Sequence, residues 1–60
     1  ASAWLELLLA DAAPEVRAAA VAAIATSRDE KLLNRAEEVA LRDTEPVVAD
    51  QLPLIRRQLR

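Results

Sequence analysis

One pattern occurs twice in this chain of 60 residues, first as ELLLADAAPEV at residues 6–16 and again as EVALRDTEPVV at residues 38–48. Glu, Leu, Asp, Pro and Val recur at the same places, and the two copies are 32 residues apart. Further along, Ala23 corresponds to Ile55, so the expected buried positions keep their register. A period of roughly 30 residues with helix–turn–helix content is typical of an α-solenoid.

Three turn sequences divide the chain into four expected helices. Pro14 and Pro46 each follow an acidic turn and suit the first position of a helix, where the N–H group that proline lacks would have no partner. Between them, Ser27 with Glu30 three residues later fits a capping box. We therefore expect helices at about residues 2–10, 14–26, 28–42 and 46–59.

Apolar periodicity supports these helices. The fourth segment carries a single apolar stripe, Val48, Leu52, Ile55 and Leu59. Pro53 predicts a kink or break in that helix, because it removes one backbone hydrogen bond. Residues 18–25 are apolar on all sides, so we expect the second helix to be covered on more than one side.

The expected fold class is all-α, with two antiparallel helix hairpins stacked as a short α-solenoid or a four-helix bundle. No alternating strand pattern and no Asn-Gly or Asp-Gly turn competes with this prediction. We expect one domain over residues 1–60, with repeat units at about 2–26 and 28–59.

Bulk composition argues against several classes of protein. The formal charge of −2 does not favour attraction to nucleic acid, and the 53% of apolar residues is too high for a disordered tail. The longest apolar run, residues 18–25, falls far short of the roughly 20 residues that span a bilayer. Residues 1–10 carry no basic group and are not typical of a signal peptide. A cytoplasmic location is the simplest expectation, and seven Arg against one Lys, with abundant Ala, suggest a bacterial gene rich in GC.

Residues 8–20, LLADAAPEVRAAA, resemble a HEAT repeat of the short bacterial kind related to phycobilisome-lyase repeats. That pattern is an apolar first helix, then Asp-x-x-Pro-x-Val-Arg, then a second helix rich in alanine. The second copy departs from it, because Ala49 stands where arginine is expected and Pro53 interrupts the helix. The resemblance implies packing of each hairpin on the next and a scaffolding or partner-binding role. An unrelated four-helix arrangement stays open as the alternative.

Catalysis has little to draw on in this chain. It contains no His, Cys or Gly, so neither a nucleophile–base pair nor a glycine-rich phosphate cradle can form. Glu37 and Glu38 are adjacent and point about 100° apart on a helix, which makes a poor acid–base pair. Four hydroxyl groups sit at expected helix starts, where capping explains them: Ser2, Thr26, Ser27 and Thr44. We expect no enzymatic activity, no cofactor and no metal site.

Five residues are candidates for contact with a partner: Trp4, Arg17, Arg56, Arg57 and Arg60. Trp4 either fills the core of the first hairpin or anchors a partner, since tryptophan is enriched in interface hot spots. Arg17 can pair with Asp11 across the turn, and HEAT-like stacks use such positions between neighbouring repeats; the alternative is two separate surface charges. The three C-terminal arginines suit an acidic partner, a phosphate backbone or a solvated helix end.

Three functions remain open. The first is a HEAT-like interaction module that binds another protein, or further repeats of the same chain, along its second helices. Because solenoids normally need at least three repeats, two repeats with an apolar first helix leave one end incomplete. The second is a self-associating four-helix docking or dimerisation domain, such as those that join subunits of bacterial multienzymes. The third, which the net charge does not favour, is a small helical nucleic-acid binder using the C-terminal arginines.

Overall fold

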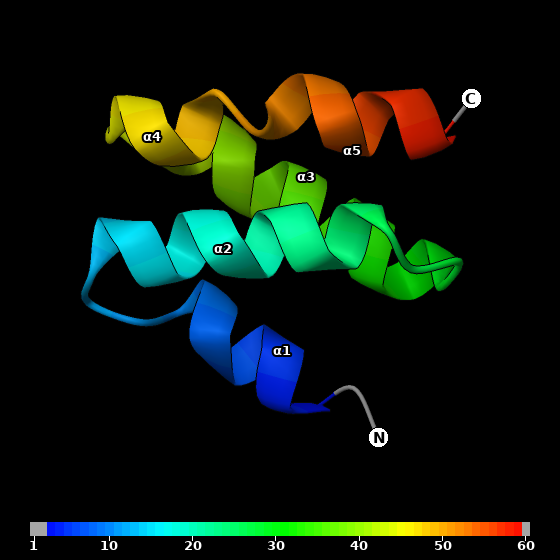
Figure 1. Cartoon of the computed structure of the whole chain (residues 1–60), viewed down its shortest axis with the longest axis horizontal. Helices are drawn as coiled ribbons and strands as arrows, with labels where there is room; N and C mark the ends of the chain where they lie inside the picture. The colour runs from blue at the N-terminus through cyan, green and yellow to red at the C-terminus, as the bar shows by residue number, and fades with distance from the viewer. Residues whose placement is uncertain (1–2, 60) are drawn as a thin grey trace.

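Five helices and no strand make up the part of the chain that this computed structural model describes, residues 3–59. They are α1 (Ala3–Leu9), α2 (Pro14–Ala25), α3 (Glu30–Arg42), α4 (Pro46–Ala49) and α5 (Leu52–Leu59). Helix α1 pairs with α2, and α3 pairs with α5, so two hairpins lie against each other (Figure 1). The fold is the expected all-α one, and its packing is consistent with a short solenoid or a four-helix bundle.

Helix α2 is the centre of the molecule. It packs against α1 on one side and against α4 and α5 on the other, with α3 behind it (Figure 1). Its small side chains let the neighbouring helices approach closely, and Val21 and Ile24 on α2 are fully buried together with Val48 and Ile55 of the second hairpin. The apolar character of residues 18–25 therefore has the expected structural cause, burial on several sides.

The two proline turns adopt the same conformation. Oδ1 of Asp11 accepts a hydrogen bond from the N–H of Ala13 at 2.9 Å, and Oδ1 of Asp43 accepts one from the N–H of Glu45 at 2.9 Å. Ala13 has φ −85° and ψ 122°, and Glu45 has φ −84° and ψ 122°. A proline begins the helix after each turn, as predicted. The sequence repeat of 32 residues is thus also a repeat of local structure.

The start of α3 differs from the predicted capping box. The helix begins at Glu30, and the carboxylate of Asp29 accepts hydrogen bonds from the N–H groups of Lys31 at 3.0 Å and Leu32 at 3.3 Å. The prediction that Ser27 and Glu30 form this cap is therefore wrong. Aspartate is as good a cap as serine, and Asp29 stands directly before the first helical residue. Ser27 Oγ instead accepts a 3.4 Å hydrogen bond from the N–H of Asp29.

Thr26 and Thr44 also do not cap helix starts. Thr26 lies at the C-terminal end of α2, where its Oγ1 donates to the carbonyl oxygen of Ala23 at 2.7 Å. Thr44 lies exposed in the turn between α3 and α4. The prediction for Ser2 falls outside the described residues.

The fourth expected helix is divided into two short ones. Helix α4 ends at Ala49 and α5 begins at Leu52, so the break lies just before Pro53. Pro53 is the second residue of α5. At that position a backbone N–H would have no acceptor within the helix, so the N–H that proline lacks costs no helical hydrogen bond. Helices α4 and α5 still run in one line along α2 (Figure 1).

Candidate functional site

Arg17 connects the two hairpins. Its Nε donates to Oδ2 of Asp43 at 2.6 Å and its Nη2 to Oδ1 of the same residue at 3.2 Å. Its Nη1 donates to the backbone carbonyl oxygens of Asp11 at 2.8 Å and Ala12 at 3.2 Å. The expected carboxylate partner, Asp11, is therefore replaced by its own counterpart one repeat later, Asp43.

This ion pair is largely shielded from solvent, since the side chains of Arg17 and Asp43 are 18% and 8% exposed. The hydrogen bonds from Arg17 hold the pKa of the Asp43 carboxyl below its ordinary value, and the backbone N–H of Glu45 adds to this. The same hydrogen bonds raise the pKa of Arg17. Both groups consequently stay charged at neutral pH, and the two parallel hydrogen bonds restrict the relative orientation of Arg17 and Asp43.

Trp4 does not fill the core. Its side chain is 58% exposed and forms one wall of a groove of about 400 Å³ between α1 and α2. The other lining residues are almost all apolar: Leu5 and Leu8 from α1, and Glu15, Val16, Ala19, Ala20 and Ala23 from α2. We call this surface the α1–α2 groove. Its lining is more apolar than that of the hollow beside Arg56 and Arg57.

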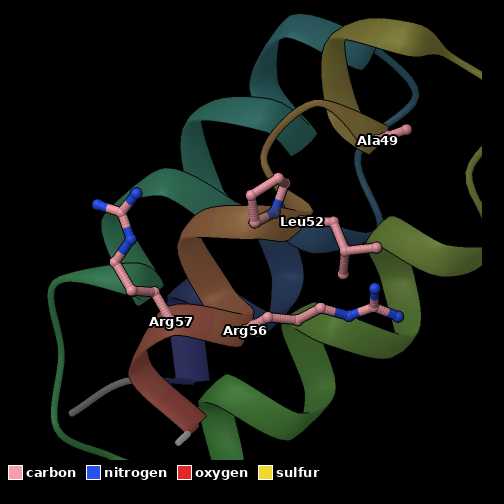
Figure 2. Close-up of a pocket in the computed structure, with 5 residues that line it drawn as sticks. Ala49, Leu52, Arg56 and Arg57 are labelled. Atoms are coloured by element: carbon pink, nitrogen blue, oxygen red, sulfur yellow. The ribbon is translucent and has the colours of Figure 1, made fainter.

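Arg56 and Arg57 do not form a joint cationic surface. Arg56 and Arg57 line a hollow of about 500 Å³ with Ala49, Leu52 and Pro53, but Figure 2 shows their side chains pointing to different sides. Nε of Arg56 lies 3.5 Å from Oε2 of Glu37, so Arg56 connects α5 to α3. Arg60 lies outside the described residues.

Residues 3–59 offer no cluster of three or more acidic side chains that would hold a metal ion. None of the helices in this part of the chain has both the length and the apolar character required to cross a membrane. Comparison with family models, with curated proteins and with solved structures found no match to the chain.

Sequence reasoning missed both Asp43 and most of the α1–α2 groove. The repeat contained a signal for Asp43, because the shift of 32 residues places Asp11 and Asp43 at equivalent positions. An arginine side chain that reaches from its own hairpin to the turn of the next one therefore finds an aspartate there as well. For the groove, the signal was weaker: α1 and α2 carry more apolar side chains than two helices in contact with each other can bury.

Proposed function

We propose that the chain is a non-catalytic protein–protein interaction or scaffold module of HEAT-like repeats, belonging to a larger chain or assembly in the cytoplasm. The observation that carries this proposal is the bidentate pair between Arg17 and Asp43. It joins the first hairpin to the second through Asp43, the residue that stands at the position of Asp11 one repeat later. A stack of this kind extends by adding units and presents a continuous surface to other proteins.

The α1–α2 groove supports binding rather than catalysis. Exposed apolar surface around a tryptophan is typical of interaction sites, because its burial against a partner releases water and fills the space beside the ring. The lining of the groove contains no hydroxyl group, thiol or histidine, and its single ionisable residue is Glu15.

A crosslinking experiment tests this function. A photoreactive amino acid replaces Ala23, which is exposed in the groove, and a matched variant carries it at Lys31, which is exposed on α3. We expect position 23 to crosslink a distinct protein, or a further part of a longer parent chain, in cells that express it. Equal crosslinking from both positions, or none above background, would contradict the proposal.

Self-association is the second candidate, and it is favoured by one observation. Leu7 on α1 is 75% exposed beside Trp4, and an apolar helix of this kind can pair with its own copy. Light scattering during size exclusion, with thermal melts over a wide range of concentration, distinguishes a self-associating domain from a monomeric interaction module. A dimer has a melting temperature that rises with concentration, whereas a monomeric module does not.

A further inference from the structure

The two hairpins meet through different faces. On α2, Ala18, Val21 and Ala25 are buried, and their three- and four-residue spacings place them on one side of the helix. Helix α2 contacts α3, α4 and α5 of the second hairpin. On α4 and α5, the residues buried in return are Val48 and Ile55, seven positions apart. The first hairpin therefore presents one side of α2 to the second hairpin, and the second hairpin presents α4 and α5 in return.

The α1–α2 groove is the counterpart of the face that the second hairpin buries. The shift of 32 residues takes Val48 to Val16 and Ile55 to Ala23, and both of these line the groove. Val48 and Ile55 are fully buried, whereas Ala23 is exposed. The groove thus lacks the cover that the first hairpin supplies to the second.

The first helices of the two hairpins, α1 and α3, also differ in burial at equivalent positions. Ala36 of α3 is 0% exposed, while its counterpart in α1, Trp4, is 58% exposed. Ala40 is buried, and its counterpart Leu8 is only partly covered. In α1 the larger side chains stand where no neighbour is present, so one more hairpin on this side would bury apolar surface of Trp4 and Leu8.

Asp11 provides the charge that such a neighbour would meet. Its carboxylate has the turn geometry of Asp43, with the same 2.9 Å hydrogen bond from the residue two positions on. Asp43 binds Arg17, but no basic side chain of residues 3–59 forms an ion pair with Asp11. By equivalence, the missing partner is an arginine at the Arg17 position of a preceding unit.

The opposite end of the molecule cannot supply that partner. In the second hairpin, the positions of Arg17, Ala18, Val21 and Ala25 are occupied by Ala49, Asp50, Pro53 and Arg57. Ala49 offers no cation to a carboxylate (Figure 2), and burying Asp50 and Arg57 in an apolar groove is unfavourable without partners. A second copy stacked head to tail therefore fits the α1–α2 groove poorly.

From these equivalences we propose that the α1–α2 groove and Asp11 form a docking site for one more helical hairpin. This hairpin presents a face of small apolar side chains like that of α2, and its arginine binds the Asp11 carboxylate. The inference rests on the proposed function and names the chemistry of the partner.

A tandem chain tests the docking site. Residues 1–32 are placed again before residue 1, which keeps the period and sets a second α2 against the groove. The added segment carries Trp4→Phe, so that the remaining Trp4 is the only fluorophore of its kind. We expect a melting temperature about 5 °C or more above that of the 60-residue chain, a blue shift of Trp4 emission and weaker quenching by acrylamide.

Matched variants isolate the ion pair. Asparagine keeps the oxygen that accepts the turn hydrogen bond but removes the charge. In the 60-residue chain, Asp43→Asn should lower the melting temperature and Asp11→Asn should leave it nearly unchanged. In the tandem chain, Asp11→Asn at the groove should lower the melting temperature about as much as Asp43→Asn does.

Two results would overturn the proposal. One is a folded tandem chain in which Trp4 stays exposed and Asp11→Asn has no effect. The other is a tandem chain that is no more stable than the 60-residue chain, both with the direct join and with a short Gly-Ser join that relieves strain at the junction. Neither result affects the crosslinking at Ala23, so a partner of other chemistry in the groove would refute this proposal and leave the proposed function standing.

Discussion

Arg17 makes contacts that a lysine could not reproduce. Its guanidinium binds both carboxylate oxygens of Asp43 while its third nitrogen donates to the carbonyl oxygens of Asp11 and Ala12. A lysine ammonium is a compact point charge and lacks this planar set of donors. One side chain therefore fixes the first turn, the second turn and the distance between them.

Acid should weaken this connection. The pKa of Asp43 lies below its ordinary value of 3.8, so the unfolded state takes up the proton more readily than the folded state. The stability that the pair contributes is complete above that ordinary value and is lost as the pH falls through the lowered folded pKa. We expect Asp43→Asn to lower the melting temperature at neutral pH and to reduce the further loss of stability below about pH 4.

Thermal melts followed by circular dichroism at a series of pH values check this prediction. Asp11→Asn is the matched control, because Asp11 makes the same turn but has no ion pair within residues 3–59. If Asp43→Asn and the unmodified chain lose stability equally between neutral pH and about pH 2, the pair does not carry the acid dependence.

At the level of the helices, short polar signals set where each element begins. Two of the helix starts use a proline after an aspartate turn, and α3 uses Asp29 as a side-chain cap. Short helices depend strongly on such signals, since their free N–H groups are a large fraction of all their backbone donors. The break between α4 and α5 follows the same logic, with Pro53 placed in a first turn that does not need its N–H.

The cap of α3 gives a direct test. Asp29→Ala should lower the free energy of unfolding by about 1 kcal/mol, because two helix N–H groups lose their acceptor. Ser27→Ala should cost clearly less, since Ser27 accepts one long hydrogen bond outside the helix. Denaturant titrations of both variants measure the difference in the free energy of unfolding. A larger loss for Ser27→Ala would contradict the Asp29 cap and support a capping box of Ser27 and Glu30.

The whole molecule depends on a small core around α2. Its largest fully buried side chains are Ile24, Ile55, Val21 and Val48. A chain of 60 residues buries only about 60% of the surface that its unfolded state exposes, so its margin of stability is narrow. Any neighbour on the α1–α2 groove would add to this margin.

A change in the core should therefore be severe. Ile24→Ala should lower the free energy of unfolding by about 2–5 kcal/mol, enough to leave much of the chain unfolded, and Ile24→Val by about 0.5–1.5 kcal/mol. Leu7→Ala is the control, because its side chain is 75% exposed and the expected loss is within about 0.5 kcal/mol. Comparable losses for Leu7→Ala and Ile24→Val, measured by denaturant titration, would show that α1 is covered in solution.

Local signals were enough to predict the helical fold, the coverage of the second helix on more than one side and the likeness of the two proline turns. Each of these depends on neighbours a few positions apart: an aspartate reaches the N–H two residues on, and a proline begins a helix whose first N–H has no acceptor. The same reasoning failed at Ser27, because two caps competed within three residues and the better-placed carboxylate of Asp29 formed the hydrogen bonds.

The contacts between hairpins depend on distance in space rather than along the chain. Arg17 and Asp43 are 26 positions apart. By charge alone, Arg17 can pair with either Asp11 or Asp43. The packing of α2 on α4 and α5 selects Asp43, whose Oδ2 lies 2.6 Å from Nε of Arg17. The exposure of Trp4 has the same origin, since it depends on how α1 packs against α2 and α3. Helix formation is governed by local hydrogen bonding and burial by the arrangement of whole helices, which is why the sequence determined the elements and the tertiary structure determined the groove and the ion pair.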